Sequence, residues 1–213
     1  KRFKKFSPLT VIWLLMAGVL LWADAILSAR QLAEILHPAP FYQLLQPLIS
    51  SYPIITNVLS LVFMLIQGIS LNQIMINRGM LDRHSLLVSL MYVLLMGSHI
   101  SLSGLHPVVF SNFFLILALH KIWLVYEEED VIREVFNVGL LTAVAGLFFY
   151  PALIFLLMNI SCLFVFYVIS GRSLMAAFIG FATPFGFTAL YYFMTEQLLA
   201  RMEALPFYLP HLN

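Results

Sequence analysis

Residues 136–166 read "FNVGLLTAVAGLFFYPALIFLLMNISCLFVF" and contain no charged side chain. The apolar run extends from 135 to 169, whereas a helix needs only about 20 apolar residues to cross a hydrocarbon core of about 30 Å. Tyr150-Pro151 is the only strong punctuation in the run. Proline lacks the amide hydrogen of a helix bond and restricts the residue before it. We therefore predict a tight outer hairpin between two membrane crossings, with a single kinked, strongly tilted helix as the alternative.

The composition of the whole chain is that of a membrane protein. Hydrophobic residues make up 62% of the 213 residues and charged residues 10%, and the mean hydropathy is +0.97. Soluble domains have about 45–50% apolar and about 25% charged residues. A net charge of +1, without a basic stripe interleaved with aromatic residues, excludes nucleic acid as a partner. The single cysteine, Cys162, excludes an intrachain disulfide and a thiolate metal cluster.

The same length criterion, applied along the chain, gives seven crossings, at 9–27, 54–76, 85–100, 108–126, 132–149, 151–169 and 174–194. We predict an all-α fold, a polytopic transmembrane helix bundle that forms a single domain over residues 1–213. The start "KRFKK" with "ADA" at 23–25 imitates a secretory signal, but six further crossings favour a retained anchor. The sequence lacks an initiator methionine, so we expect the protein to begin before Lys1, with a continuation beyond Asn213 as a second expectation.

The basic residues predict the orientation, because lysine and arginine are retained on the cytoplasmic side. With a cytoplasmic N-terminus, nine of the eleven basic residues fall inside and only Arg30 and Arg201 fall outside. The nine are Lys1, Arg2, Lys4, Lys5, Arg78, Arg83, Lys121, Arg133 and Arg172. We therefore expect a multi-pass protein of a bacterial inner membrane.

Four consecutive acids, Glu127, Glu128, Glu129 and Asp130, lie in a predicted cytoplasmic connection. Acids before a helix offset the positive end of its dipole, so a solvated helix junction is one interpretation. The functional alternative is a surface that binds a basic partner helix or a divalent cation. Adjacent acids on one turn diverge and lack the spacing of a calcium loop, so partner binding is the functional role that we assign to them.

A segment at 28–53 follows the first crossing on the predicted outer face. Its amphipathic, proline-punctuated sequence is typical of a helix lying in the membrane interface. If the protein is an enzyme, Asp24 and Glu34 are the candidate proton-transfer residues, and Arg30 and His37 are candidates for binding a lipid phosphate. The alternative is a linker that rests on the lipid.

Amides and hydroxyls, not charges, occupy the interiors of the predicted crossings. Hydrogen bonding between helices is the simpler use for such groups, and the alternative is that Gln67, Ser70 and Gln73 line a narrow polar path. We expect no ionisable group in the bundle interior, in contrast to proton-coupled pumps. His99 and His106 flank a turn without further ligands, so we expect neither a metal site nor a cofactor.

Small residues four apart predict close helix packing. Gly139 with Ala143, and Ala176 with Gly180, form two such pairs. Pro184, close to Gly186, predicts a kink in the last crossing.

Three stretches, "FKKFSPLTVIWLLMAGVLLW" at 3–22, "SNFFLILALHKIWLV" at 111–125 and the run at 136–166, resemble an uncharacterised family of multi-pass inner-membrane proteins of Bacteroidota. The resemblance implies a membrane protein without an assigned activity, so no catalytic residue is carried over. "GLLTAVAGLFFYPALIF" at 139–155 is faintly similar to membrane helices of polyprenyl-phosphate-sugar glycosyltransferases, whose acid follows the first crossing as Asp24 does here.

Three functions follow as hypotheses. The first is a non-catalytic subunit or scaffold of a cell-envelope assembly or secretion complex, with other membrane proteins and membrane lipids as partners. The second is a lipid-linked glycan enzyme of envelope polysaccharide synthesis. The third is a small transporter or lipid-binding protein.

Overall fold

A computed structural model describes residues 38–82, 85–98, 105–125, 131–167 and 170–196, together with helical positions 12, 14, 16, 18–20, 22 and 23. The described residues are helical or lie in connections, and no strand occurs among them. The all-α class is therefore confirmed. The chain divides into two compact units, of which unit 1 comprises Lys1–Ala33 and Leu44–Ile116 and unit 2 comprises Glu34–Gln43 and Leu117–Asn213. The expected single transmembrane domain stays a prediction.

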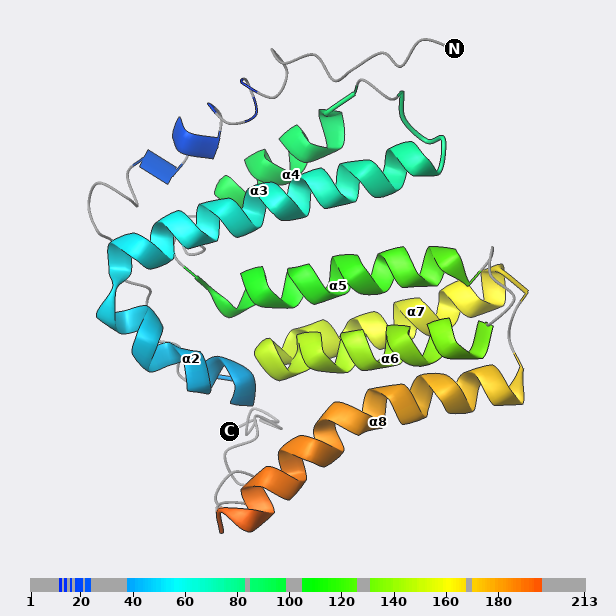
Figure 1. Cartoon of the computed structure of the whole chain (residues 1–213). Coiled ribbons are helices and arrows are strands. Elements are labelled where there is room, and N and C mark those ends of the chain that lie inside the picture. Colours follow the sequence, from blue (N-terminus) through cyan, green and yellow to red (C-terminus); the bar gives the residue numbers. More distant parts are fainter. Residues whose placement is uncertain are drawn as a thin grey trace, which may run out of the picture. The chain divides into compact units, whose positions relative to one another are not determined.

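Helices α3 to α8 (Figure 1) overlap predicted crossings, although α4 is shorter than the crossing predicted at 85–100. Helices α3, α5, α6 and α8 are long and apolar enough to cross a membrane, while α4 and the η2–α7 segment are apolar but shorter. Seven crossings and their orientation stay predictions, and much of the predicted crossing at 9–27 lies outside the described residues. The elements are α2 (Pro40–Ser51), α3 (Pro53–Asn77), α4 (Leu87–Gly97), α5 (Pro107–Leu124), α6 (Val131–Phe148), the 3-10 helix η2 (Tyr150–Ile154), α7 (Phe155–Val165) and α8 (Gly171–Met194).

Local sequence signals place the ends of these helices. Proline opens α3 and α5, where its missing N–H costs no helix bond. Helix α3 ends at Asn77 and is followed by Arg78 and by Gly79, whose φ of +69° is left-handed. The amides of Gly79 and Met80 donate back to Ile76 and Met75, which satisfies the last carbonyls of the helix. Helix α8 begins with a capping box between Ser170 and Ser173.

In unit 1, α3 packs against α4 (Figure 1). The Ser89 hydroxyl donates to the Gly68 carbonyl at 2.9 Å. A Cβ on Gly68 would lie 3.3 Å from the Ser89 carbonyl oxygen, so the small residue permits this approach. The core around it contains Leu14, Trp22, Leu61, Met64 and Val93.

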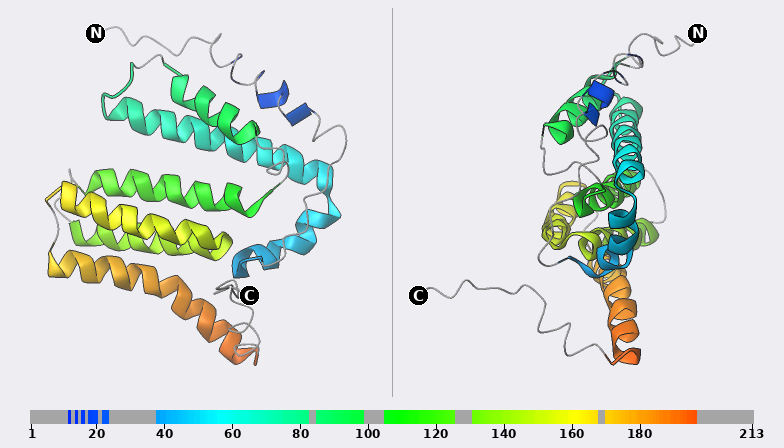
Figure 2. Two further views of the ribbon diagram at one scale, coloured as in Figure 1. Left: turned by 180° about the vertical axis from the view of Figure 1, so that it is seen from behind. Right: turned by 90° about the vertical axis from the view of Figure 1, so that its left-hand side faces the viewer.

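In unit 2, α6 and α8 lie side by side (Figures 1 and 2). A Cβ on Gly139 would overlap the Ala177 carbonyl, and a Cβ on Gly180 would overlap the Phe136 carbonyl. The predicted close approach of these small residues is therefore confirmed, and Ala143 beside them is fully buried. Farther along, α8 bends near its middle (Figure 1), as expected for a helix that contains Pro184.

The predicted turn at Tyr150-Pro151 is also confirmed. Phe149 leaves the helix with φ −149° and ψ 104°. The Asn159 amide then donates to the Thr142 hydroxyl at 2.7 Å. In one continuous helix, two residues 17 positions apart would be separated by about 25 Å. The chain thus folds back on itself, and one kinked helix is excluded. That both arms cross a membrane stays a prediction.

Candidate functional site

Several predicted site residues lie outside the described residues. These are Asp24, Arg30, Glu34 and His37 of the outer segment and Glu127, Glu128, Glu129 and Asp130 of the acidic connection. Their assigned roles stay predictions.

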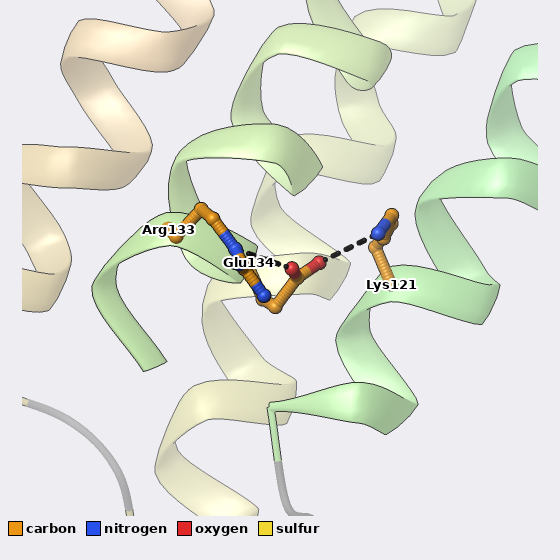
Figure 3. Close-up of polar contacts among 3 residues, drawn as sticks. All are labelled: Lys121, Arg133 and Glu134. Carbon is orange, nitrogen blue, oxygen red and sulfur yellow. Dashed lines mark hydrogen bonds and ion pairs between the residues drawn. The ribbon is translucent and has the colours of Figure 1, made fainter. Parts of the chain in front are cut away.

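An ion cluster lies immediately after the acidic connection, at the start of α6. Among the described residues, Glu134 is the one charged residue that is buried, with 1% of its surface exposed. Its Oε2 lies 3.0 Å from Lys121 Nζ on α5, and its Oε1 accepts a hydrogen bond of 3.0 Å from Arg133 Nε (Figure 3). The two cations are 34% and 58% exposed at their side chains, so they reach the surface while the acid does not.

Helix geometry explains this arrangement. Glu134 is in the first turn of α6, where the helix dipole favours an anion, and Lys121 is in the last turn of α5, where it favours a cation. The ion pair therefore joins two helix ends that are separately suited to these charges.

Glu134 corrects the expectation that no ionisable group lies in the bundle interior. The signal was present in the sequence, because "IRE" opens the predicted crossing at 132–149. An acid in a predicted crossing needs a partner, since an unpaired buried charge is costly. The sequence alone did not identify Lys121 as that partner.

Chemically, the cluster is a compensated carboxylate. Glu134 Oε1 accepts a hydrogen bond from Arg133, and Oε2 has Lys121 Nζ as a cationic neighbour at 3.0 Å, so the negative charge is compensated at both oxygens. Such a pair fixes the geometry between α5 and α6. The acidic connection at 126–130 follows α5 and precedes α6 in the sequence.

A second polar cluster joins three helices of unit 1. The Gln67 amide on α3 donates to the Val109 carbonyl on α5 at 2.6 Å and accepts from the Tyr92 hydroxyl on α4 at 2.6 Å. The Asn112 amide donates to the Tyr92 oxygen at 3.4 Å. These bonds satisfy polar groups by joining helices, one of the two uses expected for them.

The three residues of the predicted polar path have different surroundings. Gln67 is 1% exposed, Ser70 is half-buried and Gln73 is exposed. The Gln73 amide donates to Asn77 on its own helix at 2.7 Å. Tyr92, which completes the network, stood out in the sequence as a tyrosine in the middle of an apolar segment.

The described residues contain no group of three or more His, Cys, Asp or Glu side chains that could hold a metal ion. An apolar pocket between α6, α7 and α8, lined by Gly139, Asn159, Leu163 and Ala177 among others, has a volume of about 10 Å³. This is about the room of one water molecule, so the pocket is too small for a substrate.

Compared with protein-family profiles, with curated proteins and with solved structures, the chain shows no match. The arguments about function therefore rest on its own residues.

Proposed function

We propose that the chain is a multi-pass protein of a bacterial inner membrane and a non-catalytic subunit or scaffold of a cell-envelope assembly or secretion complex. The membrane location is supported by four helices of membrane-crossing length and apolarity. A cytoplasmic N-terminus is supported by the distribution of lysine and arginine over the predicted connections.

The observation that carries the scaffold role is the use of the buried polar groups. Glu134 is compensated by Lys121 and Arg133, and Gln67 bonds to α4 and α5. Polar side chains that bond across helices are a common way of holding a membrane bundle together. Here these groups hold helices together.

The partner-binding surface in this proposal is the acidic connection, Glu127 to Asp130. It follows α5 and precedes α6 in the sequence. The last turn of α5 and the first turn of α6 are joined by the Lys121–Glu134 ion pair. When the helix ends that flank a connection are held together, less conformational entropy is lost as the connection binds a partner. Four acids between such helix ends suit a basic segment of another membrane subunit.

The test is assembly in native membranes. A photo-crosslinking residue at Glu127 reports on partners in the wild-type chain, in Glu128→Lys/Glu129→Lys, and in the matched variant Glu196→Lys/Glu203→Lys on the predicted outer face. We expect one discrete adduct and a native mass above that of the chain alone, both lost only in the first variant. Equal native masses in all three proteins, with no adduct, would exclude the scaffold role for this surface.

One observation favours the lipid-linked glycan enzyme as a second candidate. A separate helix, α2, lies in the 28–53 segment that follows Asp24, and an interfacial helix suits the binding of a lipid-linked substrate. Asp24→Asn and Glu34→Gln should abolish glycan transfer while the native mass is retained if this candidate is right. Unchanged transfer in both variants would exclude these acids as its catalytic groups.

A further inference from the structure

Helix α2 has three distinct faces. Tyr42 and Ile49 are buried, at 2% and 7% exposure, whereas Leu44 and Leu48 are 67% and 63% exposed. At 100° per residue, the two leucines lie about 40° apart on the helix. Gln43, Gln46 and Ser50 gather within about 60° of one another, centred about 150° from the leucines. Ser50 is exposed, whereas Gln43 and Gln46 are half-buried. Ser51 is exposed on the side of the leucines, and its hydroxyl donates to the Pro47 carbonyl at 2.8 Å. Apart from its buried face, α2 thus has a mainly apolar side and a polar side.

Helix α2 is too short to cross the membrane, and its backbone is unsuited to the hydrocarbon centre. Its twelve residues span about 18 Å, against a hydrocarbon core of about 30 Å. Pro47 lies inside the helix and has no N–H to donate to the Gln43 carbonyl, which is on the polar side. A backbone carbonyl without its helix bond needs water or a head group and is costly in hydrocarbon.

The position of α2 in the chain identifies what covers its leucines. Tyr52 alone separates α2 from α3, a helix of membrane-crossing length. Tyr52 is 55% exposed, and tyrosine is enriched where a helix enters the bilayer. At the other end, Phe41 packs edge-to-face on Phe148 of α6, with ring centroids 5.5 Å apart. Because Tyr52 directly follows α2, the Ser51 end of α2 is at the level where α3 enters the lipid.

We infer that α2 lies along the lipid–water interface, with Leu44 and Leu48 inserted among the acyl chains and with Gln43, Gln46 and Ser50 facing the head groups and water. The inference rests on the membrane location proposed above, and the bilayer itself is the partner. It assigns to two leucines a lipid-binding role that the amphipathic pattern of the 28–53 segment did not specify.

Site-directed spin labelling tests the inference. In the Cys162→Ser background, single cysteines replace Leu44, Leu48, Gln46 and Ser50, and Ile66 on the exposed side of α3 serves as the depth reference. The labelled proteins are reconstituted in vesicles of phosphatidylethanolamine and phosphatidylglycerol. Collision rates are measured with oxygen, which concentrates in the lipid, and with a nickel chelate, which stays in water.

Labels at 44 and 48 should favour oxygen at a shallower depth than the label at 66, and labels at 46 and 50 should favour nickel. Nickel access at 44 and 48, with the label at 66 still deep, would refute the inference and leave the membrane location intact. Exclusion of both reagents from 44 and 48 would also refute it, because a protein segment would then cover the leucines. Nickel access at 66 would instead overturn the membrane location itself.

Discussion

Glu134 is the residue at which burial and charge conflict most directly. Its carboxylate is almost completely buried, but each of its oxygens has a cationic partner. Removing one partner of a buried pair is costly because the other charge is left uncompensated. The cost should therefore depend on which partner is removed, since Lys121 is partly exposed and Glu134 is not.

We expect Lys121→Met to lower the free energy of unfolding by about 1–3 kcal/mol, because it removes the cation beside Glu134 Oε2. Glu134→Gln should cost less, because the remaining cations reach the surface. The double variant, Lys121→Met/Glu134→Gln, should lose less stability than the sum of the two single losses, and the difference is a coupling free energy of about 0.5–3 kcal/mol. Unfolding in mixed detergent micelles, followed by circular dichroism, measures all three. Arg172→Met, at an exposed cation, is the control, and equal losses in Lys121→Met and Arg172→Met would contradict the pairing.

Tyr42 makes a prediction about alkaline pH. Burial raises the pKa of this phenol from 10.0 to about 12. The unfolded chain therefore loses the proton first, and the stability that Tyr42 contributes is complete below pH 10, then declines as the pH rises through about 12. A tyrosinate absorbance titration of Tyr42→Phe, subtracted from that of the wild type, should isolate a component near pH 12. If the difference curve instead shows a tyrosine that titrates near pH 10, the burial of Tyr42 is contradicted.

At the scale of the element, α6 and α8 depend on two glycines. A methyl group at Gly139 or Gly180 meets backbone of the other helix, and backbone cannot move aside as a flexible side chain can. We expect Gly139→Ala and Gly180→Ala each to cost about 1–3 kcal/mol, the range for overpacking a tight interior. Gly186→Ala, in α8 with nothing within 4 Å, is the matched control and should be neutral or slightly stabilising. The interface assignment fails if all three variants have the same midpoint of thermal unfolding.

The helices could be predicted from the sequence because apolar length and proline are local signals. The predicted crossing at 54–76 corresponds to α3 (Pro53–Asn77), and that at 108–126 to α5 (Pro107–Leu124). The helix α4 is shorter than the crossing predicted at 85–100. Apolar flanks are hydrophobic whether or not they are helical, so hydropathy alone places such ends poorly.

The contacts between helices were less predictable, for a physical reason. Small residues marked the helix faces that approach closely, but not that Gly139 would meet Ala177 and Gly180 would meet Phe136. Likewise, Gln67 was recognisable as a buried amide, while its bonds to Tyr92 and Val109 depend on how three helices pack. Which residues of two helices meet depends on how the helices pack, and the local sequence of each helix does not specify that.

At the scale of the whole molecule, the number of crossings depends on the two shorter apolar elements, α4 and the segment from η2 through α7, of which the second is the longer. Tyr150–Val165 is shorter than the four long helices. Its first five residues are a 3-10 helix, which rises about 2.0 Å per residue instead of about 1.5 Å. The segment therefore reaches about 26 Å, close to the thinner bilayers at about 27 Å. The tighter helix at its start provides length that an α-helix of the same residue count lacks.

If this segment crosses, its two ends lie on opposite sides of the membrane. In the Cys162→Ser background, a cysteine at Tyr150 should react with a membrane-impermeant maleimide added to intact spheroplasts, and a cysteine at Arg172 should react only after lysis. A cysteine at Arg78 should behave like the one at Arg172, because both positions are predicted to be cytoplasmic. Labelling of Tyr150 and Arg172 from the same side would show that the segment turns back within the bilayer, and six crossings would then replace seven. Labelling of Arg78 and Arg172 only from outside would reverse the orientation, and the acidic connection would then face the periplasm.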